Sequence, residues 1–170
     1  MRNNEYSIIN EVFNARLEDQ INGTLMAGYI YELGMPGKIL QSTGFPYEPI
    51  QLSARQLLRK SQHARHPFEL ESVRNLVIAI QHPIAIFAYG DSCKAQNIIT
   101  ELQYDEKYFL VGIHFNTHNA NCISVSNIRG IFSKDNHEWL NWILQGKTLF
   151  LNKKKIQNLI DIQGMTFSEP

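Results

Sequence analysis

The spacing of apolar residues changes near residue 84, and this change constrains the fold more than any other feature of the sequence. Before it, apolar residues recur at helical spacing and capping signals precede them, which predicts helices over residues 7–21, 36–40, 53–62 and 69–80. After it, apolar and polar residues alternate, which predicts strands over residues 84–89, 97–104, 108–115 and 122–132. We therefore expect an α+β fold in which N-terminal helices precede a four-stranded sheet.

The connections between the predicted strands are short and polar, which is typical of hairpins and predicts an antiparallel meander. In the fourth strand the apolar residues change face between Val125 and Ile128, so we expect a bulge or bend near Ser126-Asn127. A cap pattern at Asp135 then starts a helix that ends at Gly146, and a strand over 148–151 and a helix over 153–162 complete the chain.

The chain has 170 residues, of which 44% are hydrophobic and 19% are charged, and this is enough apolar material for one buried core. We expect a single domain over residues 1–170, with frayed ends at 1–6 and 164–170. No apolar run approaches the ~18 residues of a membrane span, and the first residues lack the layout of a signal peptide. These features predict a cytoplasmic protein that makes no membrane contact, or one delivered into another cell without a cleavable signal.

Sixteen Lys and Arg residues balance sixteen Asp and Glu residues, so any attraction to nucleic acid must be local. The sequence has no glycine-rich phosphate loop, no G-x-S-x-G elbow and no cysteine-based zinc pattern, which removes most other enzyme classes. His63 and His66 have a spacing that suits a metal on a helix, but no third and fourth ligand follows. We expect neither a metal nor another cofactor.

Several short motifs occur in a fixed order along most of the chain: Tyr31-Glu32-Leu33-Gly34-Met35-Pro36, Lys60 with His66-Pro67-Phe68, Asn75-Leu76, Ile99-Thr100-Glu101-Leu102, Ile128-Arg129 and Lys134-Asp135-Asn136. In these motifs the chain resembles the phage MuF C-terminal domain family over about residues 13–160. The resemblance implies a toxin-like nuclease, grouped with barnase-like and RelE-like ribonucleases, that cleaves RNA without a metal in phage–host or inter-bacterial conflict. Members often carry Ser and Tyr where this chain has Gly130 and Phe132, and Asn where it has Ser126, so this chain lacks polar groups that would support catalysis.

Cleavage of RNA without a metal needs a base, an acid and a cation that stabilises the charge on phosphorus. We predict that His66 and Glu101 share the acid–base work, while Lys60 and Arg129 hold the phosphate. Each residue also has a structural interpretation: a loop connector for His66, a solvated sheet residue for Glu101, a helix-end cation for Lys60 and a surface ion pair for Arg129. The secondary candidates are His63, His114 and Ser126.

Two tryptophans on the penultimate helix, Trp139 and Trp142, are predicted to pack in the core rather than to stack on bases. The predicted substrate is single-stranded or loop RNA, with transfer RNA as one candidate, cleaved by attack of the ribose 2′-hydroxyl. Two other hypotheses stay open: a phage-derived binding module without activity, and a toxin held inactive by an immunity or antitoxin protein.

Overall fold

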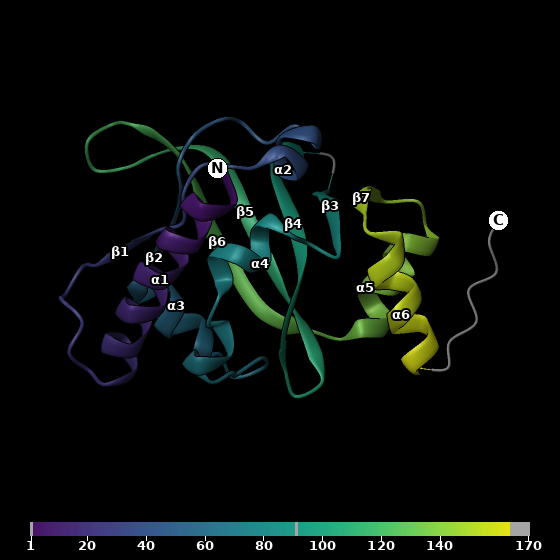
Figure 1. The fold of residues 1–170 in the computed structure, drawn as a ribbon, viewed down its shortest axis with the longest axis horizontal. Helices are drawn as coiled ribbons and strands as arrows, with labels where there is room; N and C mark the ends of the chain where they lie inside the picture. The colour runs from purple at the N-terminus through teal and green to yellow at the C-terminus, as the bar shows by residue number, and fades with distance from the viewer. Residues whose placement is uncertain (1, 91, 164–170) are drawn as a thin grey trace.

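A seven-stranded mixed sheet forms the centre of the protein, as the computed structural model shows for residues 2–90 and 92–163 (Figure 1). The strands are β1 (Ile30–Glu32), β2 (Ile50–Ser53), β3 (Ala85–Tyr89), β4 (Ser92–Tyr104), β5 (Lys107–His118), β6 (Ser124–Lys134) and β7 (Thr148–Leu151). The helices are α1 (Arg2–Ile21), α2 (Lys38–Ser42), α3 (Ala54–Ser61), the 3-10 helix η1 (Leu70–Val73), α4 (Leu76–Gln81), α5 (Asn136–Leu144) and α6 (Lys153–Gln163).

The predicted four-stranded antiparallel meander is wrong. Strands β3 to β6 are antiparallel neighbours, as expected, but the sheet order is β1-β2-β6-β5-β4-β3-β7, and β2 runs parallel to β6. β1 and β2 have three and four residues, too few for their alternation to stand out from the helical pattern around them. They also interrupt the N-terminal helices, which the sequence predicted as an unbroken block.

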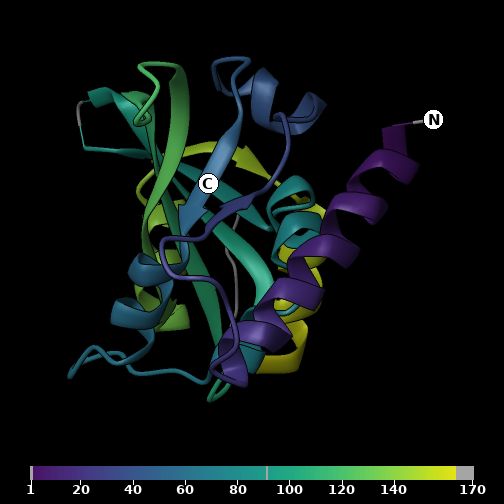
Figure 2. The same ribbon diagram turned by 90° about the vertical axis from the view of Figure 1, so that its left-hand side faces the viewer.

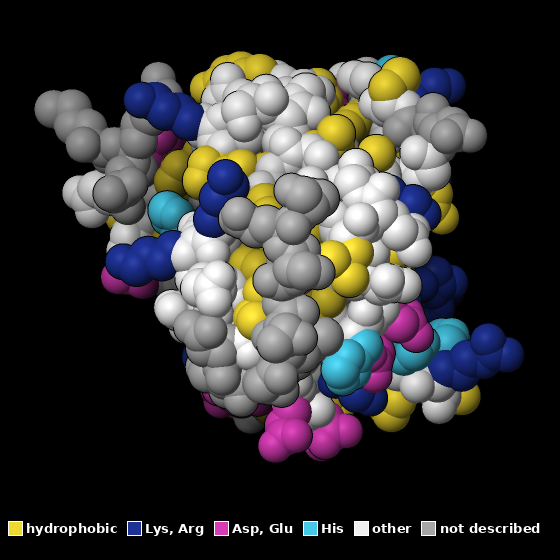
Figure 3. Space-filling view, turned by 90° about the vertical axis from the view of Figure 1, so that its right-hand side faces the viewer, with side chains coloured by type: hydrophobic (Ala, Val, Ile, Leu, Met, Phe, Trp, Pro, Cys, Tyr) yellow, Lys and Arg dark blue, Asp and Glu magenta, His cyan; other side chains and the backbone are white. Residues whose placement is uncertain are grey.

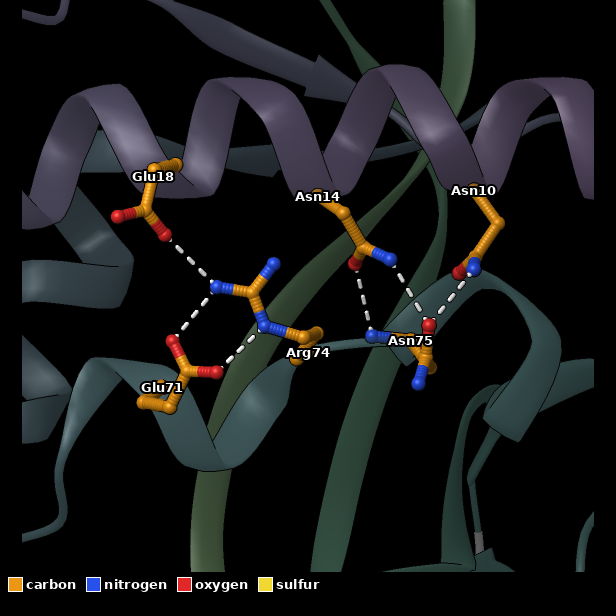
Figure 4. Close-up of polar contacts among 6 residues, drawn as sticks. All are labelled: Asn10, Asn14, Glu18, Glu71, Arg74 and Asn75. Atoms are coloured by element: carbon orange, nitrogen blue, oxygen red, sulfur yellow. Dashed lines mark hydrogen bonds and ion pairs between the residues drawn. The ribbon is translucent and has the colours of Figure 1, made fainter.

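The helix predicted over residues 69–80 is interrupted at Arg74-Asn75, and side chains of α1 form hydrogen bonds with Asn75 at this point (Figure 4). Asn75 adopts a left-handed backbone conformation with φ of 68°, which asparagine tolerates better than most residues. The backbone N–H of Asn75 donates to Asn14 Oδ1 at 2.9 Å. The side-chain amides of Asn10 and Asn14 both donate to Asn75 Oδ1. Bonds from the neighbouring helix therefore replace the intrahelical bonds that a continuous helix would make.

Helices α1 and α4 cover one face of the sheet and bury the larger core (Figures 1 and 2). Buried residues of the two helices and of the central strands share this cluster: Phe13, Leu17, Val77, Ile80, Ile98, Val111 and Ile131. α1 begins at Arg2, inside the stretch predicted to fray, and the Tyr6 hydroxyl donates to the Met35 carbonyl at 2.9 Å. The predictions for residues 1 and 164–170 lie outside the described residues.

Helices α5 and α6 pack on the other face and cover only part of it. Their cluster joins Trp139, Leu140, Ile156 and Leu159 to Ala85, Phe87, Ile99 and Leu110 of the strands. Trp139 is fully buried, as predicted, and its ring N–H donates to Asn136 Oδ1 at 3.1 Å. Within the described part of the chain, no helix is long and apolar enough to cross a bilayer.

Helix α3 lies beside β6 where β2 ends. The Ser53 hydroxyl accepts a hydrogen bond from the Gln56 amide, as the predicted cap requires. The Gln56 side chain does not complete a capping box; it donates to the Arg129 carbonyl at 2.8 Å. Leu57 of α3 is buried in the larger core, and Lys60, near the end of the helix, lines the partly uncovered face of the sheet.

Candidate functional site

A cavity of about 780 Å³ lies over the part of the sheet that α5 and α6 leave open. Its walls come from α3, from strands β3 to β6, and from the end of α5 with the loop that follows it. The lining residues are Lys60, Phe87, Ala88, Tyr89, Gly90, Asn97, Leu110, Gly112, His114, Arg129, Gly130, Phe132, Trp142 and Lys147.

Two glycines on adjacent strands produce the hollow. Gly112 of β5 is paired directly with Gly130 of β6. Both glycines line the cavity, and a Cβ atom added at Gly130 would meet only backbone atoms of Gly112, at 3.8 Å. A Cβ at Gly112 would lie 3.1 Å from Asn97 Oδ1, on the next strand. The absence of side chains at both positions therefore makes room for a ligand.

A β-bulge places Arg129 at this cavity. Gly112 pairs with Gly130 and Ile113 pairs with Ile128, so Arg129 is an extra residue on β6. A second shift in register lies between Val125 and Asn127, at the position where the sequence predicts a bend. The extra residue on β6 lets Ile128 face the larger core while Arg129 lines the cavity on the opposite side of the sheet.

The charged side chains of the cavity are all cationic. Lys60, Arg129 and Lys147 line it, and the described lining residues include no Asp or Glu. None of these three side chains forms an ion pair with a described carboxylate. Cations gathered without counter-charges create a local positive potential, so this cavity attracts an anion although the whole chain is neutral.

His114 is the titratable group of the cavity that is suited to proton transfer near neutral pH. Burial lowers its pKa below the ordinary value of 6.5, and the positive charge of Arg129 lowers it further. At pH 7 the imidazole is therefore mostly neutral and can accept a proton. Its ring lies 5.7 Å from the ring of Tyr89, which also lines the cavity.

Aromatic rings form much of the remaining wall: Phe87, Tyr89, Phe132 and Trp142. Trp142 packs edge-on against Phe87 at 5.3 Å, so it contacts the core, as predicted, and also borders the cavity. Rings exposed beside cations are the arrangement with which proteins hold unstacked bases and their phosphates. Figure 3 shows Lys and Arg side chains recurring along the right-hand border of the α5–α6 end, with histidines beside them at the lower right.

Three predicted site residues, Lys60, Arg129 and His114, meet in this cavity. His66 lies beside it, because its ring is 5.1 Å from that of Phe132, which lines the wall. His63 stacks on His66 at 6.1 Å in the loop after α3. Among the described residues, no three His, Cys, Asp or Glu side chains are grouped so that they could hold a metal ion.

Two other predicted site residues lie elsewhere. Glu101 is exposed, and its carboxylate accepts a hydrogen bond from Lys155 Nζ of α6 at 2.8 Å. Ser126 is fully buried, and its hydroxyl donates to Glu48 Oε1 at 2.7 Å. Neither residue lines the cavity, and each is engaged by another side chain.

The model of the phage MuF C-terminal domain matches residues 57–158. The chain belongs to this family. No curated protein and no solved structure shows a significant match to it. The matched segment runs from α3 to α6, and it includes all the residues that line the cavity, so the cavity lies within the MuF C-terminal domain of this chain.

Sequence reasoning missed three residues of the MuF domain cavity: Tyr89, Asn97 and Lys147. Asn97 could have been noticed from the sequence through its partner: it pairs with Gly112, and a glycine inside a strand often marks a place where a ligand approaches the backbone. Tyr89 and Lys147 gave no comparable signal. Tyr89 lies at the end of β3, and Lys147 reaches the cavity because β7, which directly follows it, pairs with β3.

Proposed function

We propose that this MuF C-terminal domain binds single-stranded RNA in the cavity and cleaves it without a metal ion. The observation that carries the proposal is the lining, in which three unpaired cations surround a neutral imidazole and several aromatic rings. Activity of this kind corresponds to the barnase-like and RelE-like toxin nucleases that the sequence resemblance implies. The RNA of a host or competing cell, including transfer RNA, is the proposed target.

In the proposed reaction Lys60 and Arg129 hold the scissile phosphate and stabilise the charge that develops on its oxygens. Neutral His114 takes the proton from the ribose 2′-hydroxyl, and the 2′-oxygen attacks phosphorus. The bond from phosphorus to the 5′-oxygen breaks as that oxygen gains a proton from His66, at the cavity edge beside Phe132. The products are a 2′,3′-cyclic phosphate and a free 5′-hydroxyl.

The residues that line the cavity also favour a single-stranded substrate over a duplex. Tyr89, Phe132 and Trp142 can stack only on bases that are free of their partners, and the cavity is too small for a helix with paired strands. A flexible strand can also adopt the in-line geometry that attack by the 2′-hydroxyl requires.

The test is incubation of the purified protein with total RNA in the presence of a chelator. We expect fragments that end in 2′,3′-cyclic phosphate, identified by mass spectrometry. Glu101→Gln is the matched control: its carboxylate pairs with Lys155 outside the cavity, so this variant should cleave at the wild-type rate. RNA that stays intact with the wild-type protein would contradict the cleavage proposal.

A second candidate is RNA binding without cleavage. It is favoured by Gly130 and Phe132, which give the cavity no hydroxyl at positions where relatives often carry one, and by the absence of carboxylates among the described lining residues. Under this alternative the protein would bind single-stranded RNA with measurable affinity and leave it intact.

A further inference from the structure

A second hollow adjoins the cavity and shares Arg129 with it. It measures about 330 Å³ and lies between α3 and β6. The lining residues are Ser53, Arg55, Gln56, Arg59, Asn127, Ile128 and Arg129. Three guanidinium groups therefore border one small space, and the described lining residues include no carboxylate.

The basic character of this hollow extends over the whole α3 region. Residues 49–68 contain four Lys and Arg residues and no Asp or Glu. Arg55 and Arg59 are one helical turn apart, so they lie on the same side of α3. Like charges at this spacing repel each other weakly, and an anion bound between them would remove the repulsion.

A chain of hydrogen bonds orients Arg59 relative to Arg129. An Arg59 Nη atom donates to Gln56 Oε1 at 2.7 Å, and Gln56 Nε2 donates to the Arg129 carbonyl at 2.8 Å. The Gln56 amide thus links the arginine of the helix to the bulge of the strand. The Arg59 guanidinium is held in this way, and guanidinium groups bind phosphate with two parallel hydrogen bonds.

From these contacts we infer that the Arg55–Arg59 hollow binds a second phosphate of the same strand that enters the cavity. This inference rests on the proposed RNA site and names its substrate class: a single-stranded polynucleotide of several residues, not a mononucleotide. The strand crosses Arg129, with one phosphate held by Lys60 and Arg129 and a neighbouring phosphate held by Arg55 and Arg59.

The test compares the binding of a labelled dinucleotide, which has a single internucleotide phosphate, and a labelled nonanucleotide by fluorescence anisotropy. Both carry 2′-O-methyl groups, which prevent cleavage. For the double variant R55Q/R59Q we expect about tenfold weaker binding of the nonanucleotide, unchanged binding of the dinucleotide, and a salt dependence of nonanucleotide binding (the slope of log K against log salt concentration) reduced by about 0.7, the value for one lost phosphate contact on a single strand. The double variant K38Q/K154Q removes two exposed cations that line neither space, so it controls for net charge.

The outcomes separate the two proposals. If the wild-type protein binds neither oligonucleotide, the proposed RNA site itself is wrong. If it binds both and R55Q/R59Q changes nothing, the RNA site stands, the second phosphate site is overturned, and the arginines serve another anion such as an acidic protein face. An equal loss of nonanucleotide binding in R55Q/R59Q and in K38Q/K154Q would also overturn the inference, because it would reflect overall charge alone.

Discussion

Replacing His114 with asparagine is expected to slow RNA cleavage by about 10²- to 10⁴-fold, the usual contribution of a general base. Asparagine keeps the size and polarity of the imidazole but cannot accept the proton of the 2′-hydroxyl. The measurement is the initial rate on a single-stranded RNA, together with thermal unfolding to show that the variant is folded. Unchanged activity in a folded His114→Asn protein would exclude this residue as the base.

The pH dependence of RNA cleavage also tests the role of His114. The reactive form of His114 is neutral, so cleavage should fall as the pH drops through its pKa, which lies below 6.5. Burial is the main cause of the lowered pKa and Arg129 is the second. Arg129→Gln should therefore move the acidic limb of the pH–rate profile to higher pH, without restoring the ordinary value. A limb that stays in place would show that Arg129 does not act on the base.

Replacing Glu48 with alanine is expected to lower the free energy of unfolding by about 2–4 kcal/mol, because three hydrogen-bond donors would lose a charged acceptor in a buried site. The carboxylate accepts from the Asn116 amide at 2.8 Å and from the hydroxyls of Ser124 and Ser126 at 2.6 and 2.7 Å. These bonds tie the β5–β6 hairpin to the loop before β2. Urea denaturation measures the change, and Glu69→Ala, at an exposed glutamate, is the control with an expected effect within about 0.5 kcal/mol.

The stabilisation by Glu48 should depend on pH. Burial raises the pKa of Glu48, but the hydrogen bonds from Ser124, Asn116 and Ser126, with the charge of His118, together hold it below the ordinary value of 4.5. A lowered pKa in the folded state stabilises the protein above pH 4.5, and this contribution is lost as the pH falls through the folded-state value. The difference between wild type and Glu48→Ala should therefore shrink in acid. A difference that persists at low pH would contradict the role of the ionised carboxylate.

The central strands were predictable because β4, β5 and β6 have 13, 12 and 11 residues, and because β3 to β6 follow one another through short polar turns. The sheet edges were not. β2 is held by a parallel pairing of Ile50 with Ser126, and a contact between residues so distant in sequence leaves no local pattern. The break before α4 was also hidden, since Asn75 is stabilised in its left-handed conformation by side chains from α1.

The candidate site was partly predictable for the same reason. Residue type and strand position predicted Arg129 and His114 as candidates, and both line the cavity; the change of face along β6 predicted a bulge near Ser126-Asn127, whereas the extra residue of β6 is Arg129. The sequence could not rank His114 above His66, because the ranking depends on burial and on the nearby Arg129 charge. Nor could it show that Glu101 pairs with Lys155, whose helix begins 52 residues further along the chain.

Tryptophan fluorescence can show directly whether single-stranded RNA enters the cavity of the MuF C-terminal domain. The chain has two tryptophans: Trp139 is fully buried, whereas Trp142 lines the cavity. Titration with a 2′-O-methyl oligonucleotide should quench the emission to saturation, and Trp142→Phe should remove the quenching. Binding that is detected by anisotropy but leaves the emission of Trp142 unchanged would place the RNA elsewhere on the protein and contradict binding in the cavity.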